Sequence, residues 1–367
     1  MRTIVLLLGI CMSVESQAEQ SVTVWFGTRG SAIYRATLDQ ESGKLSEAEA
    51  AAEIKSPGFL CVNSAGTLLY TLGNASAGED NVAVYKIDSE KNLSLLGTAN
   101  SGCGKGTHIS LSGDERTLLV AHYGGGSVAS FPIDETGKIL PPVSQIKHQG
   151  SSVNKSRQSE PHPHWIGVTP DDQFVVVPDL GLDEVVIYRL DSTAHTLTPH
   201  GKGSVPPGDG PRHLKFHRNG KWAYVINELG LTVTEFRYDE SAGTLEAMQT
   251  IEALPKSEVK EVLTSGSEIR IHPNGKFVYA GIRGHDVITV FSVNESTGEL
   301  TFVEREPIRG SWPRNFGIDP TGKWLLAAGA ESSTVSVFRV DPNTGRLTFT
   351  RNVIHVPNSI CVTFHDR

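Results

Sequence analysis

Histidines, arginines and acidic residues gather in one stretch of this chain, residues 161–230, among glycines and prolines. Its polar segments read PHPHWIGV, VPDLGLDE, GDGPRHLKF and YVINELG, in that order. A histidine beside a glutamate can move protons near neutral pH, and an arginine keeps its charge and binds carboxylate or phosphate. These residue types predict acid–base chemistry on an anionic small molecule, provided that the fold brings them together. The candidates in this stretch are His162, His164, Asp179, Arg212, His213 and Glu228.

The elements that must position these residues repeat along the chain. Residues 216–248, 271–303 and 318–350 each read as the end of one strand, a tight turn and three further strands, with weaker copies elsewhere. Four short strands at such a period are typical of one propeller blade per repeat. The turns after the leading strands lie 47 to 57 residues apart, at Gly66, Glu115, Asp172, Gly220, Gly275 and Gly322.

The two ends of the chain are predicted to complete one blade together. The first repeat, which begins at Val22, lacks a leading strand, and the last leading strand has nothing after it. We therefore predict an all-β fold over residues 19–367, a single seven-bladed β-propeller whose C-terminal strand joins the N-terminal blade. Seven copies in register argue against a β-sandwich or two smaller barrels. Leading strands are expected over 58–63, 107–112, 164–169, 212–217, 267–272, 314–319 and 359–364.

The repeat register predicts which side chains meet at the mouth of the central channel. The leading strand of each blade lines the channel, and a tight turn places its start beside the end of the second strand. Both positions therefore open on one rim. The residues predicted there are His164, Arg212, Glu228, Arg283 and Arg314. The residues on or next to equivalent positions are His108, Tyr123, Asp179 and His213.

Other interpretations of the same residues remain open. An ionic network in which Arg212 and Arg283 neutralise Glu228 would plug the channel. The H-x-H pair at 162–164, together with Asp179, could hold a metal ion, but this spacing is a weak signal, and no metal or cofactor is predicted. No G-x-S-x-G motif supports a serine nucleophile.

The composition limits the partners of the protein. The 367 residues carry a formal net charge of −8 without a run of Lys and Arg, which argues against nucleic acid. No disulfide framework is predicted, because three cysteines remain after the N-terminal segment and none forms a C-x-x-C pair. We expect these cysteines to be small buried apolar side chains in a monomer or weak homodimer. They are Cys61, Cys103 and Cys361.

Residues 1–18 have the form of a secretory signal peptide. Arg2 supplies a positive start, residues 3–12 are apolar, and Ser16 and Ala18 offer a cleavage site of small residues. The apolar run is too short to span a bilayer, and no later run is long enough. We expect cleavage after Ala18 and export to the periplasm or the medium, without a membrane partner.

Seven short motifs, taken in order, resemble those of the seven-bladed propeller lactonase family over nearly the whole chain after residue 18. They are Y-G-G-G-S-V (123–128), P-H-P-H (161–164), D-L-G-L-D (179–183), G-P-R-H (210–213), N-E-L (227–229), I-R-G (282–284) and W-P-R-N-F (312–316). The family includes bacterial propeller-type 6-phosphogluconolactonases and fungal carboxymuconate-lactonizing enzymes. Its proposed active site is a His, two Arg and a Glu on the channel rim. Matched motif by motif, these fall on His164, Arg212, Glu228 and Arg283.

The resemblance implies a carboxylic ester hydrolase, without a cofactor, that opens a sugar lactone at the channel mouth. The substrate would be of the 6-phosphogluconolactone type or an unphosphorylated aldonolactone; the signal peptide favours the latter, because 6-phosphogluconolactone is a cytoplasmic intermediate. A muconate-type lactonizing enzyme or isomerase, and a non-enzymatic propeller that binds a ligand or protein, are the alternatives. Besides the four catalytic candidates, the residues expected to bind substrate are Arg314, Asp179, His108, Tyr123 and His213.

Overall fold

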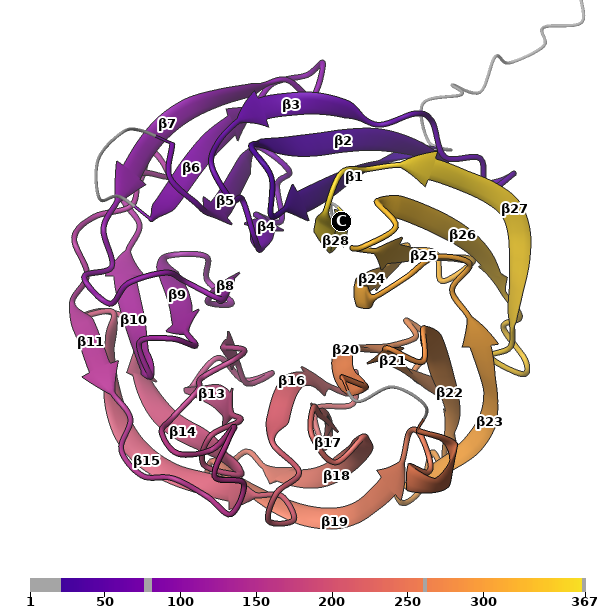
Figure 1. Ribbon diagram of the computed structural model, residues 1–367. Helices are drawn as coiled ribbons and strands as arrows, with labels where there is room; N and C mark the ends of the chain where they lie inside the picture. Colours follow the sequence, from indigo (N-terminus) through magenta and orange to yellow (C-terminus); the bar gives the residue numbers. More distant parts are fainter. Residues whose placement is uncertain (1–20, 76–80, 260–262, 365–367) are drawn as a thin grey trace, which may run out of the picture.

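The computed structural model describes residues 21–75, 81–259 and 263–364. In these ranges the strands form seven four-stranded antiparallel sheets, arranged as blades around a central channel (Figure 1). A short 3-10 helix, Lys256–Glu258, precedes the sixth blade. The predicted seven-bladed propeller is confirmed.

The blades follow one another along the chain, and the first strand named in each blade is the innermost. The first blade is β28 (Ser359–Phe364), β1 (Ser21–Thr28), β2 (Ala32–Asp39) and β3 (Glu49–Glu53). The second is β4 (Leu60–Val62), β5 (Leu68–Leu72), β6 (Val82–Ile87) and β7 (Leu93–Ala99). The third is β8 (His108–Leu111), β9 (Thr117–His122), β10 (Ser127–Pro132) and β11 (Ser144–Lys147).

The remaining four blades are continuous in sequence. The fourth is β12 (Gly167–Val168), β13 (Phe174–Asp179), β14 (Glu184–Asp191) and β15 (Thr196–Ser204). The fifth is β16 (Pro211–Phe216), β17 (Trp222–Asn227), β18 (Thr232–Asp239) and β19 (Thr244–Glu252). The sixth is β20 (Ser265–Ile271), β21 (Phe277–Arg283), β22 (Val287–Val293) and β23 (Leu300–Pro307). The seventh is β24 (Pro313–Ile318), β25 (Trp324–Gly329), β26 (Thr334–Val340) and β27 (Leu347–His355).

The ring closes as the split first repeat predicts. β28 pairs antiparallel with β1, from Val24 opposite Phe364 to Thr28 opposite Ser359. In Figure 1 the C-terminal strand β28 completes the blade that β1 begins, and it lies at the channel beside β24 and β4. Closure matters physically because it pairs strand edges that would otherwise template aggregation.

The six turn positions found in the sequence share one backbone conformation. Gly66, Gly220, Gly275 and Gly322 have φ between 64° and 79°, and Glu115 and Asp172 adopt nearly the same angle at 58° and 56°. Each of these residues donates its N–H to the carbonyl three residues earlier, at 2.8 to 3.0 Å. The repeated turn type holds the two innermost strands of these blades in one register.

The hydrophobic core lies between neighbouring blades. The second strand of most blades is buried along its whole length, as in β13 and β17. Buried clusters join adjacent sheets, for example Phe174 of the fourth blade with Phe236 of the fifth. The channel can therefore hold polar residues, because the apolar packing that stabilises the ring lies around it.

Two sequence predictions concern the N-terminus and the cysteines. The expected signal peptide, residues 1–18, lies outside the described residues. Within the described ranges, no helix has the length and apolar character needed to cross a membrane. Cys61, Cys103 and Cys361 are all free thiols; Cys361 is buried and the other two are partly buried.

Candidate active site

Strand pairing in the fifth blade places an arginine and a glutamate side by side. Pro211 of β16 pairs with Asn227 of β17, and the register shifts directly after Pro211. Arg212 therefore occupies a β-bulge, a feature that redirects a side chain. Glu228 follows Asn227, and its N–H donates to the carbonyl oxygen of Gly210 at 2.7 Å.

The other predicted rim residues reach the same mouth from three blades. The N–H of His164, which precedes β12, donates to the carbonyl oxygen of Pro178 at 3.0 Å. Arg283 is the last residue of β21. Arg314 lies at a second β-bulge, in β24 directly after Pro313. The structure thus brings together all five residues that the repeat register predicted at the mouth.

Glu228 is the centre of this group. Its Oε2 lies 3.0 Å from Nε of Arg212 and 2.9 Å from Nη2 of Arg283. Its Oε1 accepts a hydrogen bond from Nη2 of Arg157 at 2.6 Å. Nε2 of His164 lies 3.9 Å from Oε2. One carboxylate therefore contacts three guanidinium groups and one imidazole.

Charge balance sets the protonation of this cluster. Burial alone would raise the pKa of Glu228, but Arg283 and Arg212 outweigh burial and hold that pKa well below the usual range. Burial, with the nearby Arg283, lowers the pKa of Arg212 to about 10. At neutral pH the carboxylate is therefore ionised and the Arg212 guanidinium is charged. A carboxylate of such low basicity is a poor general base.

His164 is the other candidate proton acceptor at this mouth. Its side chain is buried, and burial lowers its pKa well below the ordinary value, with further lowering by Arg212 and His213. The ring is therefore neutral at pH 7. Tyr123 packs edge-on against it, with ring centroids 5.4 Å apart. A neutral imidazole beside an ionised carboxylate can take a proton, and the carboxylate then stabilises the imidazolium.

These residues border an open cavity of about 1050 Å³ at the channel mouth. Tyr123, His164 and Glu228 line it on one side, and Trp312 and Phe59 add aromatic surface. Among the described lining residues Glu228 is the single acid, whereas five are cations. The cationic residues are Arg29, Lys105, Arg157, Arg283 and Arg314. The net charge of the chain is negative, so this positive cavity is a local feature that favours anions.

Three buried guanidinium nitrogens near the cavity lack a hydrogen-bond partner among the described residues. Arg314 forms no side-chain ion pair with any described residue, and its buried Nε lacks a hydrogen-bond partner. Burial and the neighbouring Arg212 and Arg283 lower the pKa of Arg314 well below its ordinary range, and the nearby Glu228 offsets this only in part. Nη2 of Arg212 and Nε of Arg283 also lack partners among the described residues. The cavity of about 1050 Å³ remains open beside the ion pairs to Glu228, so these pairs do not fill the channel mouth.

Three residues that the sequence suggested as substrate-binding lie outside the cavity lining. Asp179 is fully buried, where its carboxylate accepts from Nδ1 of His148 at 2.7 Å and from the N–H of His162 at 2.7 Å. His108 and His213 are buried deeper in the channel, with ring centroids 5.5 Å apart. Arg212 lies behind Glu228 and is also absent from the lining.

Arg157 is the contact that the repeat pattern did not indicate. It lies in the loop between β11 and β12, which has no counterpart in the sequence repeats. Its Nη2 donates both to Glu228 and, at 3.2 Å, to the hydroxyl of Tyr123. Its side chain is 40% exposed, so it reaches the carboxylate from the open side of the cavity. Arg29 and Lys105, in exposed loops, were likewise missed.

The proposed metal alternative finds little support in the geometry. Nδ1 of His162 lies 3.0 Å from the carbonyl oxygen of Tyr123, and the two rings stack 4.2 Å apart. Asp179 is occupied by His148 and backbone N–H groups. No group of three His, Cys, Asp or Glu side chains suited to a metal ion occurs in the part of the chain that the structure describes.

Known proteins share both the sequence and the architecture. The family described as "Lactonase, 7-bladed beta-propeller" matches residues 21–364. A 6-phosphogluconolactonase of Bacillus subtilis is 39% identical over 290 residues, which cover 78% of this chain and 81% of that protein.

Solved structures agree with the sequence match. The periplasmic gluconolactonase PpgL of Pseudomonas aeruginosa superposes with a TM-score of 0.85 at 28% identity, covering 94% of this chain and 99% of that one. A Bacteroides fragilis protein reaches a TM-score of 0.86 at 32% identity, covering 96% of this chain and 99% of that one. The chain therefore belongs to the lactonase family of seven-bladed β-propellers.

Proposed function

We propose that the protein is a lactonase that hydrolyses a sugar lactone in the cavity at the channel mouth. The observation that carries the proposal is a neutral His164 beside a carboxylate held by three arginines, on a cavity lined by five cations. The family and the names of the relatives, a 6-phosphogluconolactonase and a gluconolactonase, support the same reaction class. Nothing in the site specifically favours a lactonizing enzyme or isomerase.

In the proposed reaction His164 acts as the general base. Its Nε2 takes a proton from a water molecule as the water oxygen attacks the lactone carbonyl carbon. The negative charge that develops on the carbonyl oxygen is stabilised by the guanidinium groups of Arg283 and Arg314. The ring C–O bond then breaks, and the leaving oxygen receives the proton from His164. The product is the open hydroxy acid, and no covalent enzyme intermediate is needed.

Glu228 supports this reaction through its charge. Since it remains ionised, it stabilises the His164 imidazolium that forms in the transition state, 3.9 Å away. It also orients Arg212 and Arg283, which would otherwise repel each other. We assign the binding of the substrate's anionic or hydroxyl-rich end to the exposed cations Arg29, Lys105 and Arg157.

We further propose that the protein acts outside the cytoplasm. The signal-peptide pattern of residues 1–18 supports export, and the Pseudomonas aeruginosa neighbour is named as a periplasmic enzyme. An exported lactonase would meet unphosphorylated aldonolactones or other carboxylated lactones. Cell fractionation tests the location: the protein should appear in the periplasm or medium, and retention in the cytoplasm would contradict it.

The activity is tested on a panel of lactones, with acid release followed at constant pH. Glucono-1,5-lactone and 6-phosphogluconolactone are the first members, assayed at pH 6.5 to limit spontaneous hydrolysis. We expect His164→Gln to lower kcat roughly 10²- to 10⁴-fold, because a general base contributes that much. Glu228→Gln should also lower kcat.

A matched control separates loss of chemistry from loss of fold. His272 is also a buried histidine, but it follows β20 at the end opposite the mouth, where Nε2 lies 2.8 Å from the carbonyl oxygen of Gly322. His272→Gln should keep wild-type kcat. Thermal melts of all variants verify folding. Wild-type rates in both His164→Gln and Glu228→Gln would reject the site assignment.

A further inference from the structure

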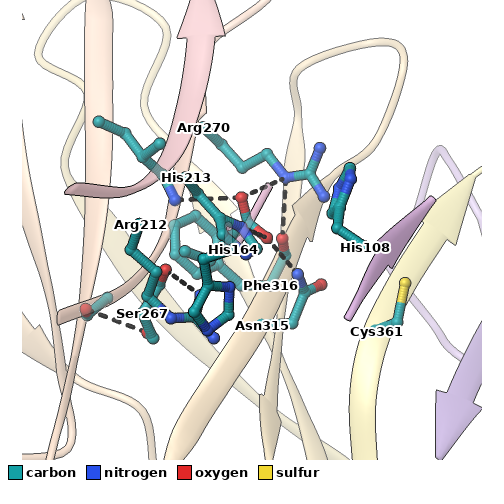
Figure 2. Close-up of polar contacts among 12 residues, drawn as sticks. His108, His164, Arg212, His213, Ser267, Arg270, Asn315, Phe316 and Cys361 are labelled. Atoms are coloured by element: carbon teal, nitrogen blue, oxygen red, sulfur yellow. Dashed lines mark hydrogen bonds and ion pairs between the residues drawn. The ribbon is translucent and has the colours of Figure 1, made fainter. Parts of the chain in front are cut away.

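A second acid–histidine pair lies in the channel behind His164. His213 is fully buried, and its Nδ1 lies 3.1 Å from Oε2 of Glu268, which is also buried. Figure 2 shows His213 close to His164, with Arg212 and Asn315 nearby. Oε2 of Glu268 also accepts a hydrogen bond from the side-chain amide of Asn315, whose own oxygen accepts from the N–H of Val362 at 2.8 Å. The acid of the sixth blade is therefore held by a residue from each of the two neighbouring blades.

These contacts determine where His213 carries its proton. Burial and the positive charge of Arg212 keep the ring neutral at pH 7, because they lower its pKa well below the ordinary value. A neutral imidazole has one N–H, and the carboxylate at Nδ1 is an acceptor. The proton is thus on Nδ1, and Nε2 carries a lone pair. That Nε2 is buried and has no hydrogen-bond partner among the residues that the structure describes.

The neighbouring ring has the complementary atom. Nδ1 of His164 is also buried without a hydrogen-bond partner. The rings of His164 and His213 lie 5.2 Å apart at an interplanar angle of 62°. A buried polar atom without a partner is costly, so two such atoms on adjacent rings call for a common explanation. A proton on Nδ1 of His164, shared with Nε2 of His213 through one water, would satisfy both.

The other groups facing these rings do not offer a better partner. His108 packs against His213 with ring centroids 5.5 Å apart, but its Nδ1 already accepts from the N–H of Ile166 at 3.4 Å. The remaining charged neighbours of the two rings are cations apart from Glu228 and Glu268. These cations are Arg212, Lys215, Arg270 and Arg314. They disfavour a positive charge on either ring. Glu228 lies 3.9 Å from Nε2 of His164, beyond hydrogen-bond distance, whereas Glu268 lies 3.1 Å from Nδ1 of His213, so the closer carboxylate sets the tautomers.

We propose that Glu268 and His213 form a positioning pair that holds His164 with its proton on Nδ1 and its lone pair on Nε2. The proposal rests on the proposed lactonase function, in which Nε2 of His164 is the proton-accepting atom. The lone pair then lies on the nitrogen nearer Glu228. When Nε2 takes the proton from water, the imidazolium has an acceptor on each side: Glu228 at Nε2 and His213 at Nδ1.

The tautomer can be measured without any substrate. We would record ¹⁵N NMR spectra of histidine-labelled protein at pH 7.5 and assign the His164 signals from the His164→Gln variant. Wild type should show a protonated Nδ1 and an unprotonated Nε2 for His164. His213→Phe should convert this signal to a mixture of tautomers, and kcat should fall roughly 10- to 100-fold with KM changed less than about twofold.

Two variants of the acid separate positioning from packing. Glu268→Gln keeps an oxygen that accepts from Nδ1 of His213, so the His164 tautomer should be retained and most of kcat with it. Glu268→Leu removes the acceptor and should resemble His213→Phe. His217→Phe is the matched control, because His217 is buried directly after β16 and away from the mouth. Its Nε2 lies 2.9 Å from the carbonyl oxygen of Gly275. It should change neither readout.

The outcomes separate this proposal from the lactonase proposal. A proton on Nε2 of His164 in wild type, or an unchanged tautomer in His213→Phe, overturns the positioning pair even if the enzyme hydrolyses lactones. The expected tautomer shifts without turnover of any lactone would support the pair and reject the lactonase proposal. Thermal melts exclude variants that fail to fold, and Glu268→Gln then supplies the decisive comparison.

Discussion

The charge on Glu228 is the residue-scale feature on which the site depends. A single carboxylate contacts Arg212, Arg283 and Arg157, so the cluster keeps a surplus of positive charge even when fully paired. Buried charges are tolerated when they are paired and costly when one partner is lost. Arg212 and Arg283 are buried, whereas Arg157 is partly exposed. The contact between Arg157 and Glu228 is therefore the one that can be removed without destabilising the fold.

Arg157→Ala should weaken binding of anionic lactones without destabilising the protein. We expect KM for 6-phosphogluconolactone or a carboxylated lactone to rise roughly tenfold, because one charge-assisted hydrogen bond is lost. KM for an uncharged lactone should rise less than about threefold, and the melting temperature should stay constant. Arg237→Ala is the control, since Arg237 forms an exposed ion pair with Glu246. An equal rise for both substrates would assign Arg157 to orienting Glu228 alone.

At the scale of elements, the repeat predicted the rim because the turns fix the register. Once the turn positions are aligned, all five predicted rim residues follow from counting along two paired strands. The β-bulges at Arg212 and Arg314 could not be predicted, because no residue type encodes them. They aim both side chains toward the channel. A regular strand would send them to the opposite face.

The same reasoning explains what the sequence missed or misplaced. Arg157 lies in an insertion between blades, where the repeat offers no register. Asp179 and His213 lie one residue from rim positions, and a shift of one residue along a strand changes where the side chain points. Asp179 points into the protein and contacts His148, whereas His213 lies deeper in the channel and contacts Glu268. Composition alone cannot distinguish these two faces.

Substitutions of Asp172 test the contribution of one of the turns that set the strand register. It adopts φ of 56°, a region that costs energy for residues with a side chain. Its carboxylate accepts hydrogen bonds from the N–H groups of Gly113 and Asp114, at 2.7 and 3.2 Å, on the neighbouring blade. Asp172→Gly removes the bonds but relieves the backbone, so we expect a loss below about 1 kcal/mol.

Asp172→Ala should be worse, because it removes the same bonds and keeps the unfavourable φ. We expect a loss of about 1–2 kcal/mol in the free energy of unfolding, measured with urea. The informative result is the order of stabilities: wild type, then glycine, then alanine. A glycine variant more stable than wild type would show that the bonds between blades contribute little.

At the scale of the whole molecule, stability depends on closing the ring. β28 supplies the innermost strand of the first blade, and its residues pack against both neighbouring blades. Trp25 and Phe26 of β1, both essentially inaccessible to solvent, lie beside this strand, opposite Thr363 and Val362. Without β28 the first blade would expose apolar surface and an unpaired strand edge.

Truncation of the chain after Asn358 should therefore abolish cooperative unfolding. We expect dye binding to exposed apolar surface and self-association, measured by fluorescence and light scattering. Val362→Ala is the graded comparison, because it removes buried methyl groups from β28 and keeps its backbone pairing. It should cost about 2 kcal/mol and leave a single transition. A truncated protein that melts within a few degrees of wild type would contradict the role of closure.

Three histidines in the channel also make the stability of the propeller depend on pH. His108, His164 and His213 come from the third, fourth and fifth blades and lie against one another at the axis. Burial lowers the pKa of each well below the ordinary value. The unfolded chain therefore binds protons at a higher pH than the folded chain. Their contribution is fully present above about pH 7 and is lost as the pH falls through and below 6.5.

Urea unfolding at pH 7.5 and 5.5 should reveal this dependence. We expect the free energy of unfolding to fall on the order of 1 kcal/mol per pH unit for each ring that stays neutral. The Glu228 carboxylate does not contribute in this window, because its pKa is lowered from an ordinary value that already lies below pH 5.5. His213→Gln should reduce the slope, whereas His355→Gln, at an exposed position on β27, should leave it unchanged. Equal stability at both pH values would mean that the three imidazoles can accept protons in the folded protein, which would contradict their burial as neutral groups.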